Sequence, residues 1–554
     1  LDRYIRHGLR LSHHEADHRL AQLAVRQLRV LGWQITETGC QPCASPVGRV
    51  MACSRAKAEA LVPILTAEHQ VLGDEIRAIV VTDFEKSSAV ASEVSHLLDA
   101  ESGGAMAAFR VLISNPSTDQ LDPVLLTGSS VLVDDDLTER FQAEAASWLQ
   151  QENLECTLEA VPYEGFHSIR GSGADWCPRV YVALVTELFQ QGITRCLVGT
   201  RGLLGEGWDA SRINVLVDLT GVTASMSVNQ LRGRSIRLDS QQPRKLADNW
   251  DVVCIAPEFA RGLDDYHRFL KRHETLFGVT DDGAIEKGVG HVHAAFQDLH
   301  PEGLEGSTAL LNEEMLRRAS RREHAWNLWK IGQPYHPEPV RTVETRPVGR
   351  HEIDHLPDLT GAAEPWNAES LGLAVGHAVL GALCEAGLLS SNWDVHASGR
   401  AGGYVRLFLE RAGQEDSAVF ARAIHEVFAP LARPRYVIPR QGVKLRETWY
   451  TRLLPAVVGR YLQRKIQRNR PELVMLHAVP AVLAKKKELV EIYQRYWNAH
   501  VSPGQAVYAL HGAGADLIDQ ARRDRLVPRS AVQEKEVFLS VGDLTQPDDS
   551  GSPA

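Results

Sequence analysis

Hydrophobic positions in the first half of the chain follow two spacings. Apolar side chains three or four residues apart predict helices over Ser54–Leu72 and Val180–Gln191. Short apolar runs rich in β-branched residues predict strands. Four such runs are Arg77–Thr82, Cys196–Gly199, Val215–Leu219 and Val252–Ile255. Because helices and strands alternate, we expect an α/β fold with a parallel sheet.

Changes in composition divide the chain into five predicted regions. They are a helical connector (1–50), an α/β domain (51–260), a helical extension with a Pro-rich linker (261–350), an accessory domain (351–543) and a polar tail (544–554). The prolines that indicate the linker include Pro337, Pro339 and Pro347. We expect the accessory domain to be mainly helical or α+β, and the tail to be disordered.

The overall composition is that of a globular protein, with 44% hydrophobic and 23% charged residues. A formal net charge of -10 argues against a protein that coats DNA through overall positive charge. The most apolar segment, Leu371–Leu389, contains His377 and Glu385, so it predicts a buried helix and not a membrane span. Eight widely spaced cysteines and no secretory signal favour a cytoplasmic protein without a membrane partner.

The clearest chemical signal lies in the segment Cys196–Asp239. Its first part is an apolar strand followed by a loop with glycines at 199, 202, 205 and 207. Glycine lets the backbone approach a ligand closely, and α/β sheets bind ligands at the carboxyl ends of their strands. Thr200 can offer a hydroxyl and an amide to a phosphate, and Asp209 can accept a hydrogen bond from a ribose hydroxyl or an arginine.

The second part of this segment predicts a helix that begins near Ser225 and reaches Arg237. Gln230, Arg234 and Arg237 are spaced i, i+4 and i+7, so they would share one helical face. Gly233 leaves room there for another surface. Two guanidinium groups on one face suit the charge that develops on a transferred γ-phosphoryl group.

The pattern Gly-x-Gly-x-Asp, followed by Gln-x-x-Gly-Arg-x-x-Arg, resembles motifs V and VI of superfamily 2 helicases. The variant Gly-Glu-Gly-Trp-Asp is most similar to the helicases of restriction and phage-defence systems and their DEAD/DEAH-type relatives. The segment Arg77–Glu85 resembles motif IV more loosely. The resemblance covers about residues 51–259 and implies a RecA-like parallel sheet domain.

The resemblance also implies roles for individual residues. Arg234 and Arg237 would be arginine fingers, and Gln230 would support them as a third catalytic residue. The implied nucleotide-binding residues are Gly207, Asp209 and Gly233. The implied contacts to the nucleic-acid backbone are Thr82, Thr200, Arg201 and Gly202.

A complete motor of this family also needs a P-loop, Gly-x-x-x-x-Gly-Lys-Ser/Thr, and acidic Mg²⁺ ligands. The chain contains no Gly-Lys dipeptide. We therefore expect ATP with Mg²⁺ as cofactor, the Mg²⁺ ligands lying on a missing N-terminal RecA-like domain or a separate ATPase subunit. Asp134 to Asp136 follow an apolar run but stand out of motif order, so we interpret them as a solvated turn. Because the first residue is Leu1, we expect a fragment or one piece of a longer product.

A basic segment, Arg433–Arg470, holds eleven Lys and Arg residues against one acid, with aromatic residues interleaved. Such a pattern is typical both of single-strand binding and of an ordinary solvated face. The nucleic-acid contacts predicted here are Arg440, Lys444 and Trp449. Cys40 and Cys43 form a lone C-x-x-C pair, which we interpret as plain loop cysteines and not as a zinc site.

Together these patterns predict the C-terminal part of an ATP-dependent DNA helicase or translocase, with RNA as another possible substrate. The alternative hypothesis is a non-catalytic nucleic-acid-binding or scaffold subunit that keeps a RecA-like fold and works with a separate ATPase. A P-loop encoded in frame upstream of Leu1 would favour the first hypothesis.

Overall fold

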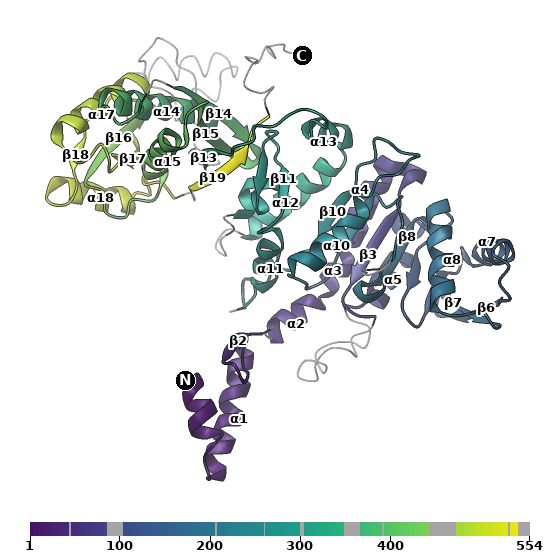
Figure 1. Cartoon of the computed structure of the whole chain (residues 1–554). Helices are drawn as coiled ribbons and strands as arrows, with labels where there is room; N and C mark the ends of the chain where they lie inside the picture. The colour runs from purple at the N-terminus through teal and green to yellow at the C-terminus, as the bar shows by residue number, and fades with distance from the viewer. Residues whose placement is uncertain are drawn as a thin grey trace, which may run out of the picture. The chain divides into compact units, whose positions relative to one another are not determined.

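The computed structural model describes residues 1–43, 46–85, 103–204, 208–259, 261–297, 299, 304–347, 366–390, 393–442, 472–529 and 532–540. The chain forms two compact units that interleave along the sequence (Figure 1). Unit 1 comprises residues 1–275 and 300–327, and unit 2 comprises 276–299 and 328–554. The polypeptide therefore passes between the units at 275–276, 299–300 and 327–328.

Unit 1 contains an eight-stranded sheet with the order β10-β9-β3-β8-β4-β5-β7-β6. The first five strands in this order are parallel, and β5, β7 and β6 join them in antiparallel fashion. The strands are β3 (Ala78–Thr82), β4 (Val124–Leu126), β5 (Val131–Asp134), β6 (Thr157–Tyr163), β7 (Phe166–Ser172), β8 (Cys196–Thr200), β9 (Val215–Asp218) and β10 (Asp248–Asp251). The predicted α/β class is thus confirmed, and the predicted parallel sheet is only mostly parallel, because β5, β7 and β6 extend it in antiparallel fashion.

Helices cover both faces of this sheet, which is why its central strands are apolar throughout. Successive side chains of a strand point to opposite faces. In β3, Ile79 and Val81 pack in one core with α7, α8 and α10, whereas Ala78 and Val80 pack in another core with α4 and α5. The helices are α4 (Leu61–Leu72), α5 (Ala105–Ile113), α7 (Thr138–Gln151), α8 (Pro178–Gln191) and α10 (Ser225–Ser235).

Two predicted elements of unit 1 differ in the structure. The strand expected at Val252–Ile255 lies four residues earlier, at Asp248–Asp251, as β10. The sequence did not indicate β10 because this edge strand is polar and half-buried, whereas the apolar residues that follow it resemble a strand. The helix expected over Ser54–Leu72 is divided into α3 (Arg55–Glu59) and α4. Pro63 lies in the first turn of α4, where the missing N–H is tolerated but a continuous helix is not.

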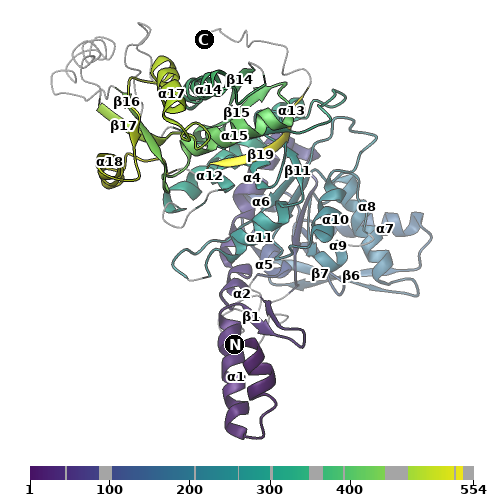
Figure 2. The same ribbon diagram turned by 60° about the vertical axis from the view of Figure 1, so that its left-hand side comes forward.

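The first residues of unit 1 fold into a small substructure, which we call the N-terminal hairpin. It consists of η1 (Tyr4–Leu9), α1 (Glu15–Val30) and the antiparallel strands β1 (Trp33–Ile35) and β2 (Cys40–Pro42). Figure 2 shows α1 as its longest element. Its core is small and consists of Ile5, Leu9, Ala21 and Ile35, with partly buried residues packed around them.

Unit 2 is an α+β structure with two antiparallel sheets, not a mainly helical one. The six-stranded sheet has the order β11-β12-β19-β13-β15-β14, and the three-stranded sheet has the order β17-β16-β18. The strands are β11 (Phe277–Val279), β12 (Ile285–Lys287), β13 (Val340–Thr345), β14 (Asp394–Arg400), β15 (Tyr404–Glu410), β16 (Tyr436–Gly442), β17 (Glu472–Ala478), β18 (Val507–Tyr508) and β19 (Gln533–Phe538). The helices include α14 (Ala368–Glu385), α15 (Gln414–Phe428), α17 (Lys487–His500) and α18 (Ala513–Arg523).

The Pro-rich linker predicted before residue 350 is not a linker throughout. Residues Val340–Thr345 form β13, which lies inside the six-stranded sheet between β19 and β15. Pro337 and Pro339 precede the strand and Pro347 follows it, so no proline removes a hydrogen-bond donor from the sheet. No helix among the described residues has the length and apolar character needed to cross a membrane.

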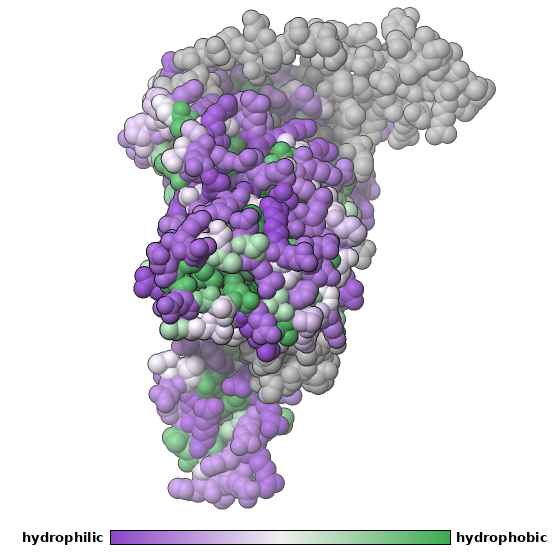
Figure 3. Space-filling model, turned by 90° about the vertical axis from the view of Figure 1, so that its right-hand side faces the viewer, coloured by the Kyte–Doolittle hydropathy of each residue, from purple (hydrophilic) through white to green (hydrophobic). Residues whose placement is uncertain are grey.

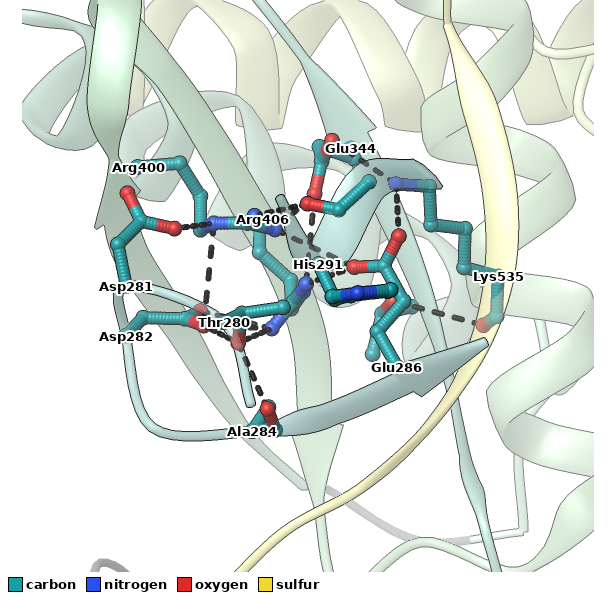
Figure 4. A network of polar contacts seen from close by, with 12 residues as sticks. Thr280, Asp281, Asp282, Ala284, Glu286, His291, Glu344, Arg400, Arg406 and Lys535 are labelled. Atoms are coloured by element: carbon teal, nitrogen blue, oxygen red, sulfur yellow. Dashed lines mark hydrogen bonds and ion pairs between the residues drawn. The ribbon is translucent and has the colours of Figure 1, made fainter. Parts of the chain in front are cut away.

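One face of the six-stranded sheet carries buried charges. In β15, Val405 and Leu407 pack with the apolar core under α14 and α15, while Arg406 between them points to the opposite face. We call the charged group on that face the buried ion network (Figure 4). Its members are Asp281, Asp282, Glu286, Glu344, Arg400, Arg406 and Lys535.

The buried ion network joins residues 276–299 to the rest of unit 2. Arg406 contacts Asp282 at 2.8 Å and Glu286 at 2.5 Å. Lys535 bridges Glu286 at 2.6 Å and Glu344 at 2.9 Å. Three of the four carboxylates thus come from the segment 276–299, whereas all three cations come from residues after 328.

Candidate functional site

The carboxyl ends of β3 and β8 place two predicted contact residues side by side. Thr82 and Thr200 are register partners in these parallel strands. Thr82 is only 1% exposed, and its hydroxyl donates a hydrogen bond to the Phe84 carbonyl at 2.9 Å. The Thr82 hydroxyl is therefore engaged within the domain, and the nucleic-acid contact at Thr82 stays a prediction. Thr200 is partly exposed and remains a candidate.

An acid that the sequence analysis missed lies at the same strand ends. Asp83 accepts a hydrogen bond from the Gly221 amide at 2.6 Å and lies 3.7 Å from the Arg201 guanidinium. It therefore links the strand end of β3 to the segments that follow β8 and β9. An acid directly after a buried strand was the available signal.

The loop after β8 is fixed at both of its described ends. A Cβ atom at Gly199 would lie 2.7 Å from the Leu126 carbonyl oxygen, so close packing requires glycine here. Arg201–Leu204 form the single-turn helix α9, in which Arg201 and Gly202 are exposed. Trp208 is buried, and its indole N–H donates to Thr186 at 2.6 Å. Gly207 lies outside the described residues.

The two motif segments meet through Asp209 and Arg237, which form an ion pair. The Arg237 side chain is 44% exposed and that of Asp209 is 64% exposed. The Lys245 ammonium group donates to the carbonyl oxygens of Ser211 and Arg237 and so bridges the same two segments. Burial lowers the pKa of Lys245 to about 8.

The helix predicted from Ser225 to Arg237 is shorter in the structure. α10 ends at Ser235, so Arg237 lies beyond the helix and does not share its face with Gln230 and Arg234. Gln230 is exposed, whereas Arg234 is 7% exposed. A Cβ atom at Gly233 would meet open space, so the packing of this unit does not itself require glycine there.

A third arginine of α10, Arg232, belongs to a buried cluster that the sequence analysis did not identify. It contacts Asp251, the last residue of β10, at 2.5 Å. Arg272, in α11 (Asp264–His273), contacts Asp251 at 2.7 Å and Asp218 at 3.2 Å. This cluster ties α10 and α11 to the carboxyl ends of β9 and β10.

Burial and charge act against each other in this cluster. Burial raises the pKa of Asp218 above its ordinary value, although Arg272 acts in the opposite direction. Burial also disfavours the charged form of Asp251, but Arg232 and Arg272 together lower its pKa below the ordinary value. Arg232 therefore serves to neutralise Asp251, and Arg234 and Arg237 remain the candidates for a phosphate.

The remaining predictions concern the basic segment Arg433–Arg470 and the acids Asp134 to Asp136. Arg440 lies in β16 and is 1% exposed, so its nucleic-acid contact stays a prediction that this buried position does not favour. Lys444 and Trp449 lie outside the described residues. The acids Asp134 to Asp136 do not form a simple solvated turn, because Asp134 is the last residue of β5 and is 3% exposed, whereas Asp135 and Asp136 are exposed.

Cysteine and histidine side chains give no sign of a metal centre in the part of the chain that is described. Cys40 and Cys43 are free thiols. No group of three or more His, Cys, Asp or Glu side chains is placed there to hold a metal ion.

Comparison with known proteins adds no relative to these observations. No protein-family model matches the chain, and no curated protein is similar to it.

Proposed function

We propose that unit 1 contains the second RecA-like domain of an ATP-dependent superfamily 2 helicase or translocase that acts on DNA. The contact between Asp209 and Arg237 carries this proposal, because it joins the glycine-rich loop to the arginine segment in space. The two segments follow β8 and β9, which flank β3 in the parallel part of the sheet, and α/β proteins bind nucleotides at the carboxyl ends of such strands. The chain lacks a P-loop sequence, so a second domain or subunit supplies the phosphate cradle and the Mg²⁺ ligands.

In this proposal Arg237 is the arginine finger that changes partner during the cycle. An ion pair between exposed side chains contributes only about 0–1 kcal/mol, so a phosphate group can replace Asp209 as the partner of Arg237. The guanidinium group then stabilises the charge that develops during phosphoryl transfer. Arg234 lies deeper in the domain, and Gln230 is exposed on the same helix to support the two arginines.

The nucleic-acid strand is proposed to run along the carboxyl ends of β3 and β8. Thr200, Arg201 and Gly202 offer a hydroxyl, a guanidinium group and open space for a phosphate. Asp83 lies near Arg201 and acts as a positioning residue for it. After hydrolysis the two RecA-like domains would separate, and this motion would move the loop together with the nucleic-acid strand bound to it.

The proposal is tested by the Arg237→Ala substitution in the chain assembled with its P-loop domain. Removal of an arginine finger lowers kcat by about 10³-fold or more, so we expect nucleic-acid-stimulated ATP hydrolysis to fall by that factor. Nucleic-acid affinity without nucleotide should stay the same. Arg170→Ala, at an exposed position of β7, is the matched control and should leave hydrolysis unchanged.

Two results would count against this function. Normal ATP hydrolysis by the Arg237→Ala assembly would favour the non-catalytic scaffold hypothesis. Strong hydrolysis by the 554-residue chain alone would show that no separate P-loop domain is needed.

A further inference from the structure

A basic groove lies on the N-terminal hairpin, away from the carboxyl ends of β3 and β8. Arg10, His18, Gln22, Arg26 and Arg29 line it together with two small apolar side chains, and no acidic residue does. The four α1 positions from His18 to Arg29 follow helical spacing, so they form one face. In Figure 3 the hairpin, at the bottom of the view, is mostly hydrophilic with hydrophobic side chains interspersed.

The acids near the start of the hairpin are engaged outside this groove. Asp2 pairs with Arg6 at 2.6 Å, and Glu15 pairs with Arg19 at 2.6 Å. Asp17 accepts a hydrogen bond from Ser12 at 2.5 Å. None of these acids lines the groove, so the exposed guanidinium groups of Arg10 and Arg26 can reach an anionic partner.

The hairpin is attached to the part of unit 1 that carries the candidate site. The Arg261 guanidinium group donates to the Leu31 carbonyl just after α1 and pairs with Asp264 at 2.9 Å. Asp264 is the first residue of α11, whose Arg272 reaches the strand ends of β9 and β10. These contacts attach the end of α1 to α11, and α11 reaches the strand ends of β9 and β10.

We propose that this groove binds the sugar–phosphate backbone of a nucleic-acid duplex. The choice of nucleic acid among polyanions rests on the proposed function. Guanidinium groups bind phosphates through paired hydrogen bonds. Single-strand sites stack bases on aromatic side chains, but none lines this groove, so a duplex fits it better. The face from His18 to Arg29 is about 16 Å long, which corresponds to roughly five base pairs.

The test is the double substitution Arg10→Gln and Arg26→Gln in the full chain, with a duplex DNA of about 25 base pairs and no nucleotide. Each lost phosphate contact makes the slope of log K against log salt shallower by about 0.9. We expect weaker binding at low salt, and a slope of log K against log salt that is shallower by about 1.8. Both side chains are exposed and lie outside the hairpin core, and thermal melting checks that the fold is retained.

Arg19→Gln is the matched control, because Arg19 is an exposed arginine of α1 outside the groove. It should leave the slope near the value of the unsubstituted chain. An unchanged slope in the double variant, or an equal change in Arg19→Gln, would overturn the groove assignment. A larger loss on single-stranded DNA than on the duplex would overturn the choice of duplex.

This test is independent of the test of the proposed function. The double variant should hydrolyse ATP normally at saturating nucleic acid when it is assembled with its P-loop domain. If Arg237→Ala fails to lower hydrolysis while the groove variants lose their salt dependence, only the helicase proposal fails. If Arg237→Ala lowers hydrolysis while the groove variants keep their salt dependence, only the groove proposal fails.

Discussion

Arg237 and Arg440 both stand near polar segments in the sequence, yet only one of them is available to a ligand. Arg237 is 44% exposed beside Asp209, whereas Arg440 is 1% exposed in a central strand of the small sheet. A guanidinium group has the same chemistry in both places. What differs is the packing around it, which depends on residues far away in the chain. Sequence patterns therefore identified candidate arginines but not their exposure.

Asp134 gives a prediction at the residue scale. Burial, together with a hydrogen bond to Asp119, raises the pKa of Asp134 to about 8. The folded state therefore holds a proton that the unfolded state loses above about pH 4, so stability falls between pH 4 and pH 8. We expect Asp134→Asn to remove this fall and to stabilise unit 1 at pH 8 by about 1–3 kcal/mol. Urea unfolding at pH 5 and pH 8 measures the effect.

Asp136→Asn is the control, because Asp136 follows the same strand but is exposed. Its unfolding free energy should have the pH dependence of the unsubstituted chain. If Asp134→Asn lost stability equally at pH 5 and pH 8, the Asp134 carboxyl would stabilise the fold through contacts that do not depend on its protonation.

At the scale of elements, the buried parallel strands were predictable and the polar edge was not. β3, β8 and β9 were located to within one residue, because a strand covered on both faces must be apolar throughout. β10 was misplaced because its sequence, Asp-Asn-Trp-Asp, has no such pattern. The sequence also predicted a helix that begins near Ser225, although this helix ends at Ser235 and not at Arg237. Asp83, Arg232 and Arg272 escaped notice because their partners are distant in sequence.

The loop after β8 gives a prediction at this scale. A Cβ atom at Gly199 would collide with the Leu126 carbonyl and the Leu204 side chain, both at 2.7 Å, whereas one at Gly202 would meet open space. We expect Gly199→Ala to lower the free energy of unfolding by about 1–3 kcal/mol. Gly202→Ala, the control, should change stability by less than about 0.5 kcal/mol. Equal effects in chemical unfolding would contradict the packing described for Gly199.

At the scale of the molecule, sequence composition could not indicate that the two units interleave. The segment 276–299 is close in sequence to α11 of unit 1, but its strands β11 and β12 belong to the sheet of unit 2. The contacts that place it there, such as those from Glu286 to Arg406 and Lys535, join residues 120 and 249 positions apart. No local pattern specifies such pairs.

This arrangement predicts how unit 2 responds to truncation. A chain of residues 328–540 keeps Arg400, Arg406 and Lys535 but loses three of the four carboxylates that neutralise them. Breaking a buried ion pair costs about 3–5 kcal/mol, so we expect this chain to lack fixed tertiary structure. Joining residues 276–299 to its N-terminus should restore near-ultraviolet circular dichroism. A cooperative thermal transition in the shorter chain would refute the prediction.

The buried ion network also determines when unit 2 can be completed during synthesis. Glu286 leaves the ribosome 249 residues before its partner Lys535. At about 5–20 residues per second, the acidic segment waits roughly 12–50 s for its last cation. Until the sheet closes, these carboxylates can remain in water, where they cost nothing to keep charged. Closure of the sheet thus comes late in translation, after the strands of unit 1 have already emerged.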